Sequence, residues 1–159
     1  MARRLTRISI LTAMSLTFFL FEGIFPTPFF LPGMKLGLAN VVTVFALYKL
    51  ENEVDALIIL LLRNFLSVIF SGSPTIIFFS LSGGLLSFAA MIFLKRSEKF
   101  SVVGVSAAGG FFHNLGQIFC AAVLMESVSV FFYFGALGIF GIVSGIFIGK
   151  LANSVKLPK

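Results

Sequence analysis

The sequence has few charged and chemically reactive residues, and each shortage excludes a class of protein. Only 11% of the 159 residues are charged, whereas 58% are hydrophobic. A soluble domain of this size has too much surface for its volume to hide so many apolar side chains. The single cysteine, Cys120, lies within an apolar run, which excludes a disulfide framework and leaves the redox compartment undecided. An integral membrane protein is the simplest interpretation.

Several catalytic patterns are also missing. The chain has no Walker A pattern, which argues against ATP hydrolysis by that route. Its only aspartate is Asp55, so it lacks a pair of aspartate-rich motifs for holding a magnesium diphosphate. His113 and Cys120 share a helical face, but no further histidine or cysteine completes a metal site. A nucleophile paired with His113 lacks an evident carboxylate to orient the imidazole. We therefore expect a chain that is not an enzyme and holds no cofactor or metal.

Apolar segments of the length of a membrane span follow one another along the chain. A span needs ~20 apolar residues, so this length allows about six spans with tight loops and no separate soluble domain. We expect an all-α integral membrane protein of the multi-pass type, with a single transmembrane domain over residues 1–159. The expected spans are residues 5–25, 36–50, 54–70, 75–94, 102–125 and 128–151.

Basic residues lie at the ends of these spans and predict the orientation of the protein. If both termini are cytoplasmic, Lys35 lies outside and Arg63 lies within the membrane. The other basic residues then all lie on the cytoplasmic side: Arg3, Arg4, Arg7, Lys49, Lys95, Arg96, Lys99, Lys150, Lys156 and Lys159. This positive-inside distribution accounts for the net charge of +6 without a nucleic-acid partner. We expect a prokaryotic-type cell membrane protein.

Polar side chains within the apolar runs are the candidates for a binding site. His113 and Gln117 lie one helical turn apart, with Asn114 beside them. Arg63 and Asn64 interrupt the leucines and isoleucines of the third span. A charge near the middle of the bilayer costs ~2.5–3.5 kcal/mol even on lenient insertion scales, so Arg63 is expected to face a cavity or a buried partner.

Asn40 in the second span and Lys35 at its start extend this polar set. With the orientation above, all these side chains lie at middle to outer depths and are able to converge on one pocket that opens outward. The proline-rich loop 26–33 would cover it. The donors in this set favour a ligand with an anionic or carbonyl-rich end.

Small residues predict close helix contacts. Gly109, Gly110 and Gly116 leave space for a neighbouring helix or a ligand. A second series recurs every fourth residue in the last span (Gly141, Gly145 and Gly149) and is expected to serve packing. A third series in the first span (Ser9, Ala13 and Thr17) suits either packing within this protein or docking to a partner subunit. The acidic turn of Glu51, Glu53 and Asp55 is expected to be a solvated loop.

Three stretches resemble a known family. Residues 32–40, followed by 41–48, resemble the hallmark of the Gx transporter family, which is also labelled heptaprenyl diphosphate synthase component I. Residues 83–88 and 104–117 resemble its two other signature stretches. That family is similar to the substrate-binding S components of energy-coupling factor (ECF) transporters. The resemblance implies a six-helix bundle whose first long loop closes over a ligand held in the outer half.

The resemblance also implies partners. The first helix of an S component commonly docks on a coupling subunit through an Ala-x-x-x-Ala ridge, which reads Ser9-x-x-x-Ala13 here. Our leading hypothesis is an S component that imports a small organic solute together with a coupling subunit and two ATPases, the ATP being used by these partners. The solute would be bound by Arg63, Asn64, His113, Asn114 and Gln117, with Asn40 and Lys35 near the gate.

Two other hypotheses stay open. The chain would be a membrane accessory subunit of a heptaprenyl or polyprenyl diphosphate synthase, or a carrier of an isoprenoid precursor, working with a soluble synthase subunit. Alternatively, it would be a structural membrane protein whose polar residues only link helices.

Overall fold

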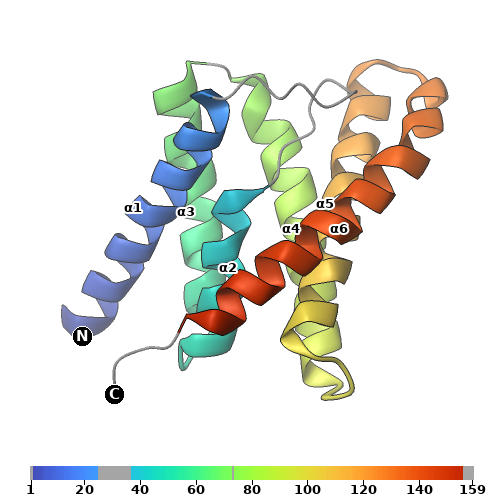
Figure 1. The fold of residues 1–159 in the computed structure, drawn as a ribbon. Coiled ribbons are helices and arrows are strands. Elements are labelled where there is room, and N and C mark those ends of the chain that lie inside the picture. The colour runs from blue at the N-terminus through green and yellow to red at the C-terminus, as the bar shows by residue number, and fades with distance from the viewer. Residues whose placement is uncertain (1, 25–36, 73, 156–159) are drawn as a thin grey trace.

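The computed structural model describes residues 2–24, 37–72 and 74–155, and these residues form helices and short connections without a strand. Each expected span coincides with a helix whose ends lie within a few residues of the expected ones, and the sixth begins with a 3₁₀ turn. In chain order the helices are α1 (Ala2–Ile24), α2 (Leu38–Lys49), α3 (Glu53–Ser71), α4 (Thr75–Arg96), α5 (Val102–Leu124), η1 (Val128–Tyr133) and α6 (Phe134–Ser154) (Figure 1).

Five segments are long and apolar enough to cross a membrane: α1, α3, α4, α5 and the continuous stretch Val128–Ser154. Helix α2 has 12 residues and rises only ~18 Å, which is short of a hydrocarbon core of about 30 Å. The residues before it, including Lys35 and the loop 26–33, lie outside the described part of the chain. The fold is thus an all-helical membrane type, while the sixth crossing stays a prediction.

Local sequence explains where several helices begin and end. The Asn52 side chain accepts a hydrogen bond from the Val54 N–H at 2.9 Å and caps the start of α3. The Ser101 side chain caps α5 in the same way through the Gly104 N–H. Helix α3 ends at Gly72, whose φ of 67° is in the left-handed region that glycine adopts without strain.

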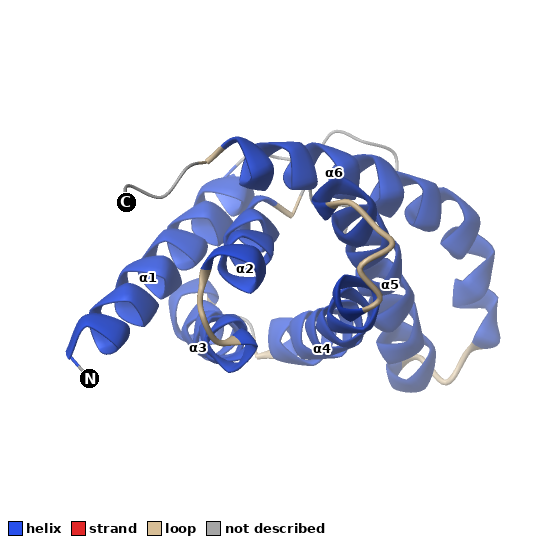
Figure 2. Ribbon diagram, turned by 90° about the horizontal axis from the view of Figure 1, so that it is seen from below, coloured by secondary structure: helices blue, strands red, loops and turns tan. Residues whose placement is uncertain are grey.

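The helices surround α2. Seen from below (Figure 2), α3, α4 and α5 form a curved row, and α6 runs along the opposite side. Helix α2 contacts α1, α3 and α6, while α5 contacts both α4 and α6. In Figure 1 the start of α1 and the end of α6 lie toward the same end of the molecule. This agrees with both termini on one side of a membrane, although which side is cytoplasmic stays a prediction.

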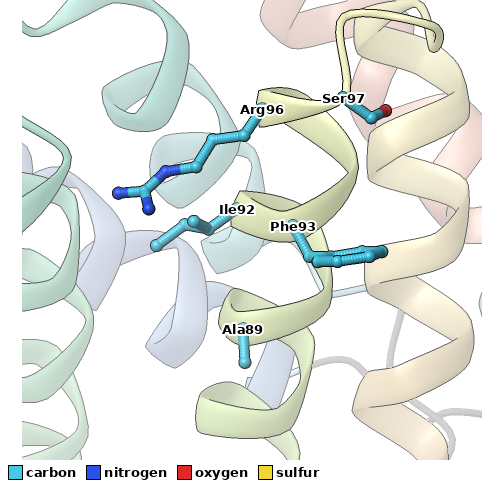
Figure 3. Close-up of a pocket in the computed structure, with 5 residues that line it drawn as sticks. All are labelled: Ala89, Ile92, Phe93, Arg96 and Ser97. Atoms are coloured by element: carbon cyan, nitrogen blue, oxygen red, sulfur yellow. The ribbon is translucent and has the colours of Figure 1, made fainter.

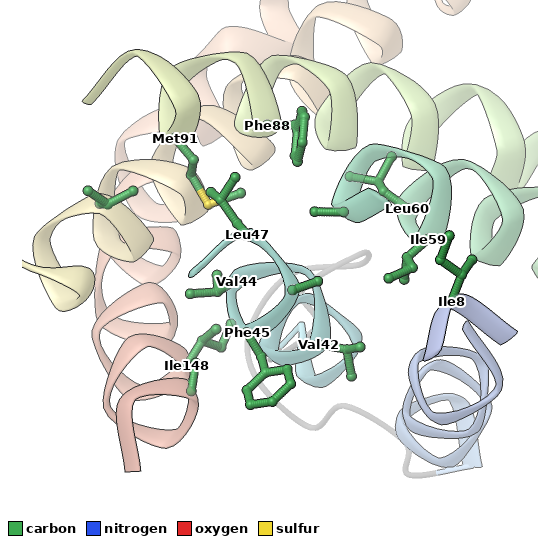
Figure 4. Close-up of a cluster of buried hydrophobic side chains, with 14 residues drawn as sticks. Ile8, Val42, Val44, Phe45, Leu47, Ile59, Leu60, Phe88, Met91 and Ile148 are labelled. Carbon is green, nitrogen blue, oxygen red and sulfur yellow. The ribbon is translucent and has the colours of Figure 1, made fainter. Parts of the chain in front are cut away.

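The hydrophobic core is built around α2 (Figure 4). Its residues Val42–Leu47 are all buried, so this helix is enclosed on every side. Ile59 and Leu60 of α3 pack against it, as does Ile148 of α6. A helix that is apolar all round is stable when other helices enclose it, and this packing explains how α2 is stable despite its short length.

The glycines of α6 allow a close contact with α5. A Cβ atom on Gly145 would collide with the Ser106 carbonyl, and one on Gly149 would lie 2.8 Å from the Cα of Val103. On α5, Gly110 meets Gly141, and Gly116 meets the Ser82 carbonyl of α4. The packing role expected for the α6 glycines is confirmed, and Gly110 and Gly116 admit neighbouring helices.

The outer surface is rich in large apolar side chains, unlike that of a soluble protein. Large apolar side chains cover the outside, such as Phe132 at 90% exposure and Phe93 at 76%. Arg63, by contrast, is only 4% exposed and Asn64 is fully buried. Exposed apolar area on this scale suits a lipid surround.

The acidic turn differs from the expected solvated loop. Asp55 is 7% exposed and receives hydrogen bonds from Arg4, with Nη2 at 2.6 Å from Oδ1. Glu53 accepts from Lys95 Nζ and Arg96 Nη2, both at 2.9 Å. Glu51 alone behaves as expected, with a 96% exposed side chain. Two of the three carboxylates therefore tie α3 to α1 and α4, because desolvated carboxylates need partners.

Candidate functional site

A cavity of about 730 Å³ lies among the helices and reaches the end of α1, where Phe19 and Glu22 line it. Every helix contributes to its wall. The polar part of the wall includes Glu22, Asn40, Arg63, Ser80, His113, Asn114, Gln117, Tyr133 and Ser144. The apolar part includes Phe19, Ile76, Phe79, Ile118, Val130, Leu137 and Ile148. A wall that combines several polar groups with a larger apolar surface suits an amphipathic small molecule.

Arg63 is the cation of this cavity. Its Nε and Nη2 atoms are buried and have no hydrogen-bond partner among the described residues. Its guanidinium carbon lies 5.8 Å from the centre of the Phe19 ring, which stabilises the charge by a cation–π contact. The expectation that Arg63 faces a cavity rather than lipid is confirmed. Unpartnered, buried charged donors are costly, and an acceptor on a ligand would satisfy them.

Glu22 is the anion of the cavity, and sequence reasoning missed it. This residue of α1 is 6% exposed and interacts electrostatically with Arg63, although the two form no direct ion pair. Its carboxylate accepts the backbone N–H groups of Gly37 at 2.6 Å and Leu38 at 3.1 Å. It thereby caps the start of α2, where a negative charge is favoured. A weaker signal was present, because Glu22 is a carboxylate within the expected span 5–25, although it lies closer to the end of its span than Arg63 does.

The three polar residues of α5 reach the same cavity. His113 presents a buried Nδ1 that has no hydrogen-bond partner in the part of the chain that the structure describes. The Asn114 amide donates to the Leu137 carbonyl of α6 at 2.6 Å, so it also joins two helices. Gln117 lines the wall one turn further along. The structure therefore brings this stretch together with Arg63, as the sequence suggested.

The remaining predicted site residues are placed differently. Asn40 of α2 lines the cavity. Asn64 is not part of the cavity wall, because its side chain is directed to the contact between α3 and α4, where Nδ2 lies 3.4 Å from the Ser80 carbonyl. Grouping Asn64 with Arg63 in one pocket was wrong, since adjacent residues of a helix point about 100° apart. Lys35, the predicted gate residue, lies outside the described residues.

A second hollow of about 520 Å³ lies along the last turns of α4 (Figure 3). Ala89, Ile92, Phe93, Arg96 and Ser97 line it, all from one helix and its cap. Its only charged side chain, Arg96, is already paired with Glu53. It therefore offers no free polar group comparable to those of the main cavity.

The small-residue series of α1 faces outward. Ser9, Ala13 and Thr17 are all exposed, so they do not serve packing within the described chain. Of the two roles left open by the sequence, packing within this protein does not fit this placement. Docking to a partner subunit does fit it and stays a prediction.

No group of three or more histidine, cysteine, aspartate or glutamate side chains is close enough to hold a metal within residues 2–24, 37–72 and 74–155. The donors that converge on the cavity are one guanidinium, one imidazole and several amides. These groups are able to bind an organic ligand through hydrogen bonds.

These features define an all-helical, membrane-type protein built around an internal cavity with a buried arginine. The chain belongs to the family described as heptaprenyl diphosphate synthase component I, whose profile matches residues 11–155. No significant match was found among curated proteins or among solved structures. Component I is a non-catalytic subunit, which agrees with the expectation that this chain is not an enzyme.

Proposed function

We propose that this chain is the membrane-embedded, non-catalytic component of a heptaprenyl or related polyprenyl diphosphate synthase. Its cavity would bind a small amphipathic isoprenoid and make it accessible to a separate catalytic subunit. The observation that carries the proposal is the cavity of about 730 Å³ with the buried, unpartnered Arg63 donors in its wall.

The chemistry of the wall supports an isoprenoid. The apolar portion is formed by aromatic and branched side chains such as Phe79, Ile118 and Ile148. These surfaces gain about 25 cal/mol for each Å² of apolar ligand area that they remove from water. Arg63, His113 and Gln117 supply donors for an oxygen at the polar end.

The need for a partner follows from the residues that this chain lacks. Prenyl transfer uses diphosphate groups, which magnesium and carboxylate clusters hold in place. Asp55 is the only aspartate in the sequence, and it is bound to Arg4 far along α3 from the cavity residue Arg63. A catalytic subunit rich in aspartate would therefore have to perform the transfer.

Mass spectrometry of the gently purified protein tests this proposal. The expected result is a bound prenyl compound together with a soluble synthase subunit. The matched control is the Arg63→Gln/His113→Ala double variant, which should lose the compound and keep the subunit. A preparation that carries neither a prenyl compound nor a synthase would refute the proposal.

A second candidate function is the S component of an ECF importer. It is favoured by the exposed Ser9, Ala13 and Thr17 series on α1, which suits docking on a coupling subunit. In that case a coupling subunit and two ATPases would co-purify, these ATPases would use the ATP, and solute uptake would depend on ATP. Ala13→Leu on the exposed face should then abolish this association and leave the cavity intact.

A further inference from the structure

The charges on the cavity wall nearly cancel. Within the described residues, Arg63 and Glu22 are the lining side chains with a formal charge, and they have opposite signs. An ordinary imidazole is neutral at pH 8, so His113 adds a polar group without a charge under that condition. The remaining polar groups of the wall are amides and hydroxyls, which contribute donors and acceptors only.

Glu22 is held in place by the backbone. Hydrogen bonds from the Gly37 and Leu38 N–H groups occupy both of its carboxylate oxygens. The carboxylate therefore cannot leave the cavity when a ligand enters without uncapping α2. Its negative charge acts on any anion that approaches Arg63, because buried charges are screened less than exposed ones and both side chains are buried.

We propose that Glu22 determines specificity by restricting the cavity to ligands whose polar end carries at most one negative charge. This inference rests on the proposed function and narrows it. A ligand with one negative charge is attracted to Arg63, whereas a diphosphate brings two or more negative charges into a wall whose described residues hold one cation, Arg63, and one fixed anion, Glu22. The bound form is then an isoprenoid alcohol or a singly charged isoprenoid such as a carboxylate, rather than the diphosphate.

Three probes with the same C15 chain test the inference: farnesol, farnesoic acid and farnesyl diphosphate. Equilibrium binding is measured with the purified full chain in an uncharged detergent at pH 8, without magnesium. Farnesoic acid is expected to bind at least about tenfold more tightly than the diphosphate, and farnesol to bind measurably.

Two variants change the charge of the cavity wall in opposite directions. Glu22→Gln removes the anion and keeps an acceptor oxygen for the α2 backbone, so it should improve diphosphate binding by about tenfold. Gln117→Glu adds an anion of nearly the same shape and does not touch that cap. It also removes one amide donor, which affects farnesol and farnesoic acid alike, so it should weaken farnesoic acid about tenfold more than it weakens farnesol.

The unfolding temperature is recorded for both variants, and Gln117→Glu keeps the test valid if Glu22→Gln does not fold. The inference is overturned if the diphosphate binds the unaltered protein as tightly as farnesoic acid, or if Gln117→Glu weakens farnesol and farnesoic acid equally. Two other results would refute the proposed function and the inference together. In the first, none of the three probes binds the unaltered chain. In the second, all three bind Arg63→Gln as well as they bind the unaltered chain.

Discussion

The Arg63 guanidinium is nearly enclosed at 4% exposure, and two of its nitrogens have no hydrogen-bond partner. Its neighbour Asn64 is fully buried at the contact between α3 and α4 and does not line the cavity. These two residues are adjacent in sequence, but their side chains leave the helix in different directions. Substitutions at these two positions should have different consequences.

Arg63→Gln should lower the affinity for farnesoic acid by about 10–100-fold, because a hydrogen bond to a charged group contributes about 1.5–3 kcal/mol. Asn64→Ala should lower the unfolding temperature and change this affinity by less than about twofold. Equilibrium binding and thermal unfolding of both variants provide the check. Equal losses of affinity in the two variants would contradict the assignment of Arg63 to the cavity.

In the acidic turn, Asp55 is a buried carboxylate and Glu51 is an exposed one that serves as its control. The Asp55 side chain is 9% exposed and holds the Arg4 guanidinium, whereas the Glu51 side chain is 96% exposed and lies 3.9 Å from Arg7. Asp55→Asn should lower the unfolding temperature because it removes a charge-assisted contact between α1 and α3. Glu51→Gln should leave it unchanged, since exposed ion pairs contribute little. Similar thermal unfolding of the two variants would contradict this distinction.

At the scale of elements, the close contact of α5 with α6 depends on glycines, which have no side chain to keep the two helices apart. Gly145→Ala in α6 should destabilise the protein by about 1–3 kcal/mol, because the new methyl group would press on the Ser106 carbonyl. Gly135→Ala in the same helix is the control, since no atom lies within 4 Å of the added group. That variant should be neutral or more stable, because alanine favours a helix. Chemical or thermal unfolding in detergent measures both, and a stable Gly145→Ala variant would disprove the close contact.

Helix α2 shows how an element depends on its neighbours. Its 12 residues are too few to cross a bilayer, yet most of them are buried. Glu22 of α1 caps its start, and α3 and α6 cover its sides. This helix therefore connects the cavity to the hydrophobic core, and a loss of the Glu22 cap would affect both.

For the whole molecule, the basic residues predict cytoplasmic termini. In a Cys120→Ser background, Lys99→Cys should react with a membrane-impermeant maleimide only after the cells are permeabilised. Val128→Cys, at the start of η1 and 82% exposed, should react in intact cells. Labelling of Lys99→Cys in intact cells, with Val128→Cys protected, would establish the opposite orientation.

Local properties of the sequence were enough to predict the membrane class, the positions of the helices and the packing role of the α6 glycines. Apolar runs, turn residues and four-residue spacings all act over a few neighbouring positions. The cost of burying Arg63 was predictable for the same reason, because one charge in a span is unfavourable wherever its partner lies. The same argument applied to Glu22 and would have included it in the site.

Which side chains contact one another was decided by the tertiary structure. Glu22 meets the start of α2 and the field of Arg63, 41 residues away, only after α1, α2 and α3 have packed. Packing likewise directed Asn64 to α4 and converted the acidic turn into ion pairs with Arg4 and Lys95. No periodicity encodes these contacts, because each depends on how separate helices rotate about their axes and pack against one another.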